Sequence, residues 1–215
     1  LLRSVDSFTG NLPQQLSSLI GRDDVVTEVA DLVRAGRLVT LTGVGGVGKT
    51  RLALEVGAEL AGELPDGVWM VDLASIGDPA SIPAAGGSGL GSARPGGAAL
   101  VDTVAEALGG RELLLVVDNC EHVLTAAASA MATIHRRSRS VKILATSRET
   151  LALDGETVRT VEPLAVDGDI TSDAVTLFVD RARAVRPDFA LSAPETATAV
   201  AEICETLDGI PLGIE

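Results

Sequence analysis

Residues 38–51 read LVTLTGVGGVGKTR, an apolar and β-branched run followed by a glycine-rich turn, a lysine and a threonine. The run is typical of a buried strand, and the residues after Lys49 have the apolar spacing of an amphipathic helix. Between them lies the spacing Gly-x-x-x-x-Gly-Lys-Thr, which is that of a phosphate-binding loop. Lys49 is one of only two lysines in the chain, so composition alone rarely produces this match.

The residue types of this loop fit the chemistry of a polyphosphate. The glycines allow backbone angles that point successive N–H groups at an anion, and the following helix adds its partial positive charge. Lys49 would reach the terminal phosphates, and the Thr50 hydroxyl would coordinate Mg²⁺. The alternative is a glycine-rich strand-to-helix turn with an exposed lysine. The predicted nucleotide-binding residues here are Gly43, Val44, Gly45, Gly46, Val47, Gly48, Lys49, Thr50 and Arg51.

Apolar runs and amphipathic stretches alternate along the chain, which predicts an α/β fold with a parallel sheet. Strands are expected at 38–42, 68–73, 113–118, 141–146 and 157–161, and helices at about 22–35, 49–63, 99–109 and 122–137. Two more amphipathic helices, 171–186 and 194–208, follow without an intervening strand. We expect a linker over 1–18, a P-loop NTPase domain with a five-stranded parallel sheet covered by helices over 19–163, and the start of a small helical module over 164–215.

The segment AAGGSGLGSARPGG at 84–97 is rich in Gly and Ser and has no clear period. This composition favours a surface loop. A second phosphate cradle is the alternative, but no strand precedes the segment and no lysine follows it.

Two other expected strands end in residues suited to a metal and nucleotide site. LLLVVDN places Asp118 at the carboxyl edge of the sheet, where ligands of open α/β sheets bind. There Asp118 would bind Mg²⁺ directly or through water, with helix capping as the alternative. Asn119 follows where many fast ATPases carry an acid, so slow hydrolysis is expected, with Glu121 as a candidate substitute. ATSRE places Arg148 at the same edge, where it would sense a γ-phosphate; a surface ion pair is the alternative.

The charge balance argues against other functions. The chain has 17 basic and 30 acidic residues, a net charge of −13, so an extended basic face for nucleic acid is not expected. The RRSR run at 136–139 is typical of a solvated helix end. No apolar run approaches the roughly 20 residues that cross a bilayer. Cys120 and Cys204 form no CxxC pattern, and Cys120, Glu121 and His122 lack a second ligand pair, which favours a cytoplasmic protein without a structural metal.

With these motifs assembled, the chain resembles the nucleotide-binding core of the signal-transducing ATPases with numerous domains. More specifically, it resembles the NB-ARC-like branch found in large bacterial, especially actinobacterial, transcriptional regulators. The matching motifs are LIGRDD (19–24), GVGGVGKT (43–50), LLLVVDNCEHV (113–123), ILATSRETL (143–151) and LDGIPLGIE (207–215). The resemblance implies that the fourth strand lies between the strand before the P-loop and the strand of Asp118, which would put Arg148 beside Lys49.

The resemblance also implies roles for residues outside the P-loop. Leu19, Ile20, Gly21 and Arg22 would surround the adenine and ribose of ATP or ADP. Gly209 and Pro211 correspond to a motif that packs its proline near the adenine. Asp23 stands where Glu is common, and Gly213 where Ala is usual. Implied partner regions are a winged helix and a repeat sensor after Glu215, and an upstream cyclase or DNA-binding domain; a nucleotide-dependent oligomer is also implied.

The function expected from these residues is a regulatory switch that binds ATP or ADP with Mg²⁺ and hydrolyses ATP slowly. Such a switch needs contacts that differ between the two nucleotides. Lys49, Asp118 and Arg148 are the candidate catalytic residues, and Thr50 and Asp118 the candidate metal ligands. The alternatives are a phosphotransferase or housekeeping ATPase acting on a small-molecule acceptor, and a scaffold in which ADP is structural.

Overall fold

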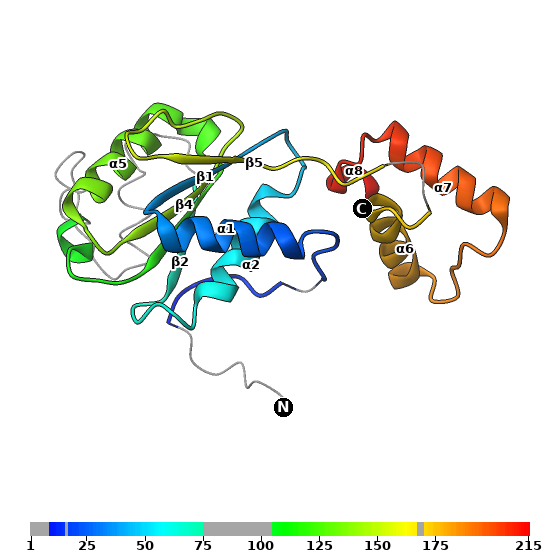
Figure 1. Ribbon diagram of the computed structural model, residues 1–215, viewed down its shortest axis with the longest axis horizontal. Coiled ribbons are helices and arrows are strands. Elements are labelled where there is room, and N and C mark those ends of the chain that lie inside the picture. Colours follow the sequence, from blue (N-terminus) through cyan, green and yellow to red (C-terminus); the bar gives the residue numbers. More distant parts are fainter. Residues whose placement is uncertain (1–8, 16, 75–104, 167–169) are drawn as a thin grey trace.

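The computed structural model describes residues 9–15, 17–74, 105–166 and 170–215 of the chain. Its elements are α1 (Asp23–Ala35), β1 (Leu38–Thr42), α2 (Lys49–Leu60), β2 (Val68–Asp72), β3 (Leu114–Asp118), the 3₁₀ turn η2 (Cys120–Val123), α5 (Leu124–Arg137), β4 (Lys142–Thr146), β5 (Thr157–Thr160), α6 (Asp173–Val185), α7 (Pro194–Thr206) and α8 (Pro211–Ile214) (Figure 1). Within these residues, every helix is too short or too polar to cross a membrane.

The five strands form one parallel sheet in the order β2-β3-β4-β1-β5. All five expected strands are present, with ends that differ by no more than one residue from the predicted ones. The expected position of β4 between β1 and β3 is also confirmed. Since parallel strands end at the same edge, the carboxyl ends of β1, β3 and β4 lie side by side.

Helices cover both faces of the sheet, because alternate residues of each buried strand point to opposite sides. Val116 and Leu144 pack with α1 and α2, whereas Val117 and Ala145 pack with α5. Residues 105–108 are helical and belong to the α5 face through Ala105 and Leu108. The expected loop at 84–97 and most of the expected helix at 99–109 lie outside the described residues.

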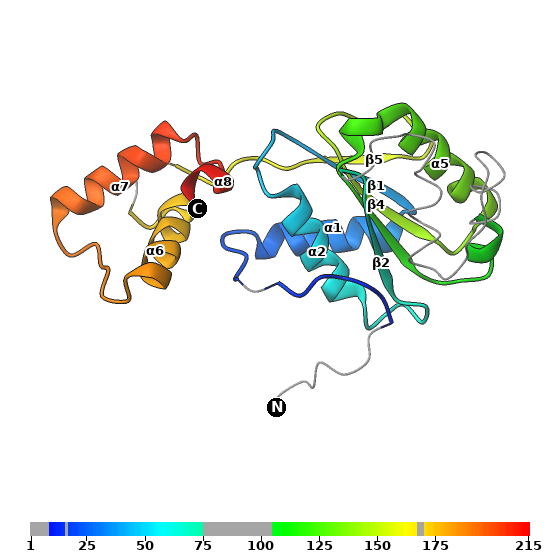
Figure 2. The same cartoon turned by 180° about the vertical axis from the view of Figure 1, so that it is seen from behind.

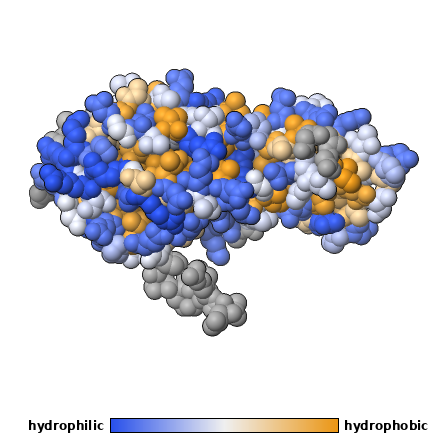
Figure 3. All heavy atoms as spheres, in the orientation of Figure 1, coloured by the Kyte–Doolittle hydropathy of each residue, from blue (hydrophilic) through white to orange (hydrophobic). Residues whose placement is uncertain are grey.

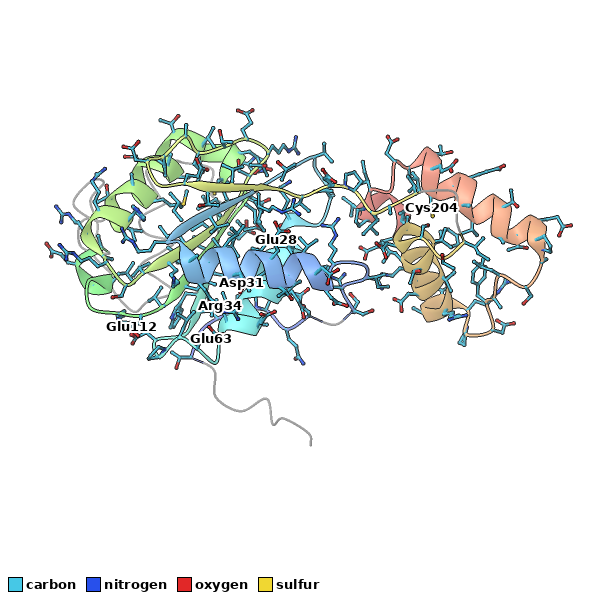
Figure 4. All side chains as sticks on the ribbon, viewed as in Figure 1. Glu28, Asp31, Arg34, Glu63, Glu112 and Cys204 are labelled. Carbon is cyan, nitrogen blue, oxygen red and sulfur yellow. The ribbon has the colours of Figure 1, made fainter. Side chains whose placement is uncertain are left out.

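The helices α6, α7 and α8 form a separate group to one side of the sheet, and α8 is the member nearest to it (Figures 1 and 2). The predicted helices 171–186 and 194–208 are confirmed as α6 and α7. This group has its own apolar cluster, which includes Leu177, Val200 and the buried Cys204 labelled in Figure 4. Serine at the start of α6 caps it, since Ser172 Oγ accepts a hydrogen bond from the backbone N–H of Val175.

The face that carries α1 is mainly hydrophilic, with smaller hydrophobic areas between the hydrophilic residues (Figure 3). An ion-pair cluster joins α1 to α2 and the residues after it, where Arg34 contacts Asp31, Glu59 and Glu63. Arg34, Asp31 and Glu63 are labelled in Figure 4. Hydrogen bonds to these carboxylates, that to Glu63 first, raise the pKa of Arg34. Because the cluster is exposed to solvent and salt, its contribution to stability is small.

The second lysine of the chain stabilises the end of a helix. Lys142, at the start of β4, donates hydrogen bonds to carbonyls at the C-terminal end of α1. They belong to Val33, Arg34 and Gly36, at 2.7, 3.0 and 3.0 Å. A cation here satisfies carbonyls that the helix leaves unpaired and complements the helix dipole. Arg37 acts similarly at the end of α5, donating to the carbonyls of His135 and Ser138.

We expect Lys142→Met to lower the free energy of unfolding by about 1 to 3 kcal/mol, because partly buried carbonyls lose a charged donor. Urea denaturation followed by circular dichroism measures this change. Arg139→Met is the matched control, since Arg139 is an exposed cation close in sequence, and it should stay within about 0.5 kcal/mol of the native chain. Equal effects of the two substitutions would contradict the capping role.

Candidate functional site

The predicted phosphate-binding loop lies between β1 and α2, at the carboxyl edge of the sheet. Gly43, Gly46 and Gly48 have φ angles of +145°, +77° and +95°, a backbone region that favours glycine. Space is also restricted, because a Cβ on Gly43 would lie 2.6 Å from the carbonyl oxygen of Val161. The loop leads directly into α2, whose first residue is Lys49, so its N–H groups and the helix N-terminus converge.

The Lys49 side chain folds back over this loop and is only 8% exposed. Its Nζ donates to the carbonyl oxygens of Gly43 and Val44 at 2.9 and 3.0 Å. Burial lowers the pKa of Lys49; Glu121 and Asp118 oppose that effect, and Arg148 adds to it. The ammonium group is therefore held at the site by backbone acceptors, and an anion in the loop would lie within its reach.

Asp118 lies at the end of β3, is 2% exposed, and faces Thr50 rather than capping the turn that follows. Thr50 Oγ1 donates to Asp118 Oδ1 at 2.8 Å, and the hydroxyl of Thr146 donates to the same oxygen. Asn119 Nδ2 donates to Asp118 Oδ2 at 3.0 Å, so both carboxylate oxygens are held in place. A hydroxyl and a carboxylate side by side are the hard oxygen donors that Mg²⁺ prefers, so these residues fit that ion.

Arg148 follows β4 and lies beside the loop, as the strand order requires. A Cβ added to Gly45 would be 3.3 Å from Arg148 Nη2. The guanidinium also forms an ion pair with Glu121, with 3.4 Å between Arg148 Nε and Glu121 Oε1, while the Arg148 side chain is 63% exposed. The surface ion pair considered from the sequence is thus present, and the same guanidinium borders the phosphate loop.

Four of the residues that the resemblance places around a base and ribose line one narrow crevice beside the loop. They are Leu19, Ile20, Arg22 and Pro211, and Gly48 and Arg51 of the predicted phosphate-binding segment line it with them. Gly21 borders an adjacent cavity instead, and a side chain there would collide with Asp173 of α6. Gly209 has a φ of +63° and packs against the backbone of Leu164, which places Pro211 at the start of α8.

Arg22 is 5% exposed, although it is an arginine. Its Nη2 donates to the carbonyl oxygen of Glu162 at 2.9 Å, and the guanidinium lies against Gly48 of the loop. Burial lowers the pKa of Arg22, and the charge of Asp173 opposes this shift. Arg22 therefore connects the start of α1 to the phosphate loop and to the segment that leads into the helical group.

Several residues of the crevice were not predicted from the sequence. They are Ser18, Leu164, Leu177, Arg181 and Glu215. Arg181 donates to Glu215 Oε1 at 2.8 Å, and Arg51 Nη1 lies 3.4 Å from the same oxygen. Leu177 and Arg181 are four residues apart on α6 and so share a face, which is the only sequence signal that associates them.

The helical group also contacts the phosphate loop through the backbone. The N–H of Leu212 donates to the carbonyl oxygen of Gly46 at 3.2 Å. A Cβ on Gly46 would lie 2.9 Å from the Leu212 Cβ, so the two segments are in close contact. The crevice beside them measures about 30 Å³, and Pro211 of α8 and Gly48 of the loop both line it.

Fold and site together define a P-loop NTPase. The chain matches the family described as AAA domain over residues 33–151, more than half of its length, and it belongs to that family. It is 43% identical over all 215 residues to the uncharacterized protein Rv0894 of Mycobacterium tuberculosis, of which it covers 53%. It is also 43% identical, over 86% of its length, to Rv0890c of the same organism, named as an HTH-type transcriptional regulator, of which it covers 20%.

Among solved structures, the chain is similar to the STAND protein PH0952 of Pyrococcus horikoshii, which has a tetratricopeptide repeat sensor. The TM-score is 0.62 at 15% identity, covering 93% of this chain and 30% of that one. The expected resemblance to the cores of signal-transducing ATPases and of actinobacterial regulators is therefore confirmed. The chain spans about half the length of Rv0894 and a fifth of Rv0890c, so these relatives contain further segments.

We expect Gly46→Ala to separate α8 from the phosphate loop, because the substitution adds a clash with Leu212 to an unfavourable φ of +77°. Hydrogen exchange of the 209–215 peptide should become about tenfold faster or more. Gly45→Ala is the matched control, since its Cβ would meet only the guanidinium end of the Arg148 side chain, 3.3 Å away, and no part of α8. Unchanged exchange in Gly46→Ala would contradict the contact.

Proposed function

We propose that this chain is the nucleotide-binding switch of a larger regulator, binding ATP or ADP with Mg²⁺ and hydrolysing ATP slowly. The observation that carries the proposal is the convergence of three groups at one sheet edge. The phosphate loop presents Lys49, the Thr50 and Asp118 oxygens lie beside it, and the guanidinium of Arg148 borders it. The remaining groups of the crevice would bind the base and ribose.

The switch depends on contacts that ATP makes and ADP lacks. Lys49 would contact the β- and γ-phosphates, and Arg148 the γ-phosphate, whereas Arg22 and Pro211 would contact both nucleotides alike. Thr50 and Asp118 would hold Mg²⁺, which when bound neutralises charge on the phosphate oxygens. Since a ligand shifts a conformational equilibrium only by its differential affinity, Arg148 is the main candidate for distinguishing the two states.

The conformational element that we propose to respond is the helical part, 164–215, relative to the sheet-containing part, 19–163. Glu215 of the helical part forms ion pairs with Arg51 of the sheet-containing part and with Arg181 of α6. The backbone N–H of Leu212 donates a hydrogen bond to the phosphate loop. The narrow crevice implies that these contacts must loosen before a base enters, which would make nucleotide exchange slow. The similarity to a transcriptional regulator supports a role in controlling gene expression.

We expect Lys49→Ala to weaken the binding of both ATP and ADP by about 100-fold or more, since a charge-assisted phosphate contact is lost. Isothermal titration calorimetry in the presence of Mg²⁺ measures both affinities. The control is Arg139→Ala, which removes one exposed cation far from the loop and should leave affinity within about twofold. Native affinities in Lys49→Ala would remove the basis of the proposal.

We expect Arg148→Ala to weaken ATP more than ADP, by about tenfold relative to the native ratio, because only ATP presents a γ-phosphate to the guanidinium. The same titrations supply the ratio. Equal losses for both nucleotides would make Arg148 a general phosphate contact, and no loss for either would leave it with the Glu121 ion pair alone.

A further inference from the structure

The chain before α1 lies along the edge of the sheet. Residues 9–15 run beside β2 and then pass α2 on the way to α1 (Figures 1 and 2). Gly10 forms a parallel bridge with Val68 of β2. The N–H of Val68 donates to the carbonyl oxygen of Thr9 at 3.0 Å, and the N–H of Asn11 donates to the carbonyl oxygen of Val68 at 3.3 Å. Since β2 is an edge strand, these bonds pair backbone groups that an exposed edge leaves open.

The side chain of Asn11 continues this pairing. Its Nδ2 donates to the carbonyl oxygen of Met70 at 2.9 Å, and its Oδ1 accepts from the N–H of Met70 at 2.6 Å. The carboxamide thus pairs with β2 as a backbone amide would. The approach is close, because a Cβ on Gly10, whose φ is +149°, would lie 2.0 Å from the carbonyl oxygen of Val68. Glycine is therefore required where the chain meets β2.

A second attachment lies at Arg51, in the first turn of α2. Arg51 Nη2 donates to the carbonyl oxygen of Ser18 at 2.8 Å and to the hydroxyl oxygen of Ser17 at 2.7 Å, and it also contacts the Ser17 carbonyl. Nη1 of the same guanidinium lies 3.4 Å from Glu215 Oε1. Arg51 therefore joins the chain before α1, the helix after the phosphate loop, and the helical group.

We call residues 9–15 with Ser17 and Ser18 the N-terminal segment. Between its two attachments, Leu12 reaches the core, since a Cβ on Gly57 of α2 would lie 3.1 Å from Leu12 Cδ1. The segment is otherwise loosely packed there, because residues 12–15 line a hollow of about 470 Å³ against α2. Its position consequently depends on the hydrogen bonds at β2 and at Arg51.

We infer that the N-terminal segment couples the β2 edge to the nucleotide crevice, and that Arg51 is the positioning residue through which it acts. Ser17 and Ser18 orient the guanidinium toward Glu215, and this ion pair holds the helical group at the crevice. Detachment of the segment from β2 removes these acceptors, so the pair with Glu215 weakens. Such a coupling is reciprocal: a firmly docked helical group also secures the segment on β2.

The inference rests on the proposed function in one respect, the rate at which a bound nucleotide leaves. Arg51 lines the crevice together with Glu215. When the helical group is held less firmly, the crevice opens more often and the nucleotide dissociates faster. An event at the β2 edge thereby changes how long the chain keeps its nucleotide.

The test detaches the N-terminal segment at β2, away from the crevice, with Gly10→Ala, whose Cβ would collide with the Val68 carbonyl. Hydrogen exchange of the 209–215 peptide, measured on the nucleotide-free chain, should become about fivefold faster, the scale of a partly exposed ion pair with its supporting hydrogen bonds. Dissociation of a fluorescent ADP analogue in stopped flow should accelerate by a similar factor. The matched control is Gln14→Ala, an exposed position of the same segment, which should change both rates by less than about twofold.

A double-mutant cycle tests the route through Arg51. Arg51→Met removes the guanidinium and keeps the apolar stem, so this substitution alone should also accelerate exchange of the 209–215 peptide about fivefold. In that background Gly10→Ala should add no further acceleration, because the connection is already broken. Two independent structural defects would instead multiply their effects.

Each outcome decides the inference. Native exchange in Gly10→Ala, an equal change in Gln14→Ala, or an undiminished effect of Gly10→Ala beside Arg51→Met overturns it. Thermal melting checks that each variant folds. If Gly10→Ala does not fold, Asn11→Ala, which removes the paired carboxamide, is judged by the same criteria.

The two measurements also separate this inference from the proposed function. Faster exchange with an unchanged rate of ADP dissociation overturns the control of nucleotide release, while nucleotide binding stands. A native chain that binds neither ATP nor ADP rejects the proposed function. Hydrogen exchange then decides by itself whether the N-terminal segment and the helical group are coupled.

Discussion

The site depends on one constraint of the sheet, the parallel placement of β4 between β1 and β3. The phosphate loop leaves β1, Asp118 ends β3, and Thr146 ends β4, so the carboxyl edge collects groups that are far apart in sequence. The hydrogen bonds from Thr50 and Thr146 to one oxygen of Asp118 are the direct result. In an antiparallel sheet some of these residues would lie at opposite edges, and in a parallel sheet of another strand order they would not be neighbours.

A second constraint is the close contact between the sheet-containing part and the helical group. The N–H of Leu212 donates a hydrogen bond to the carbonyl oxygen of Gly46 in the loop, and Glu215 forms ion pairs with both Arg51 and Arg181. The ion pairs among these contacts are partly exposed, and each part has its own apolar cluster, although Ile20 of the sheet-containing part packs against that of the helical group. The switch that we propose requires these contacts to change with the bound nucleotide.

The net charge of this acidic chain does not show where its individual charges lie. Its two lysines serve opposite ends of the sheet: Lys49 folds over the phosphate loop, whereas Lys142 binds carbonyls at the end of α1. Glu121 and Arg148 neutralise each other beside the loop. A net charge of −13 therefore coexists with a local concentration of cationic groups where phosphate would bind.

Much of the fold could be predicted from the sequence because apolar periodicity and the P-loop spacing are local properties. They indicated the five strands, the helices α6 and α7, and the loop of Lys49 and Thr50. What only the tertiary structure decided was pairing across long separations: the bond from Arg22 to the Glu162 carbonyl, the bridge at Glu215, and the approach of Glu121 to Arg148. Such contacts depend on strand order and on the packing of α6 and α8, which no short stretch of sequence encodes.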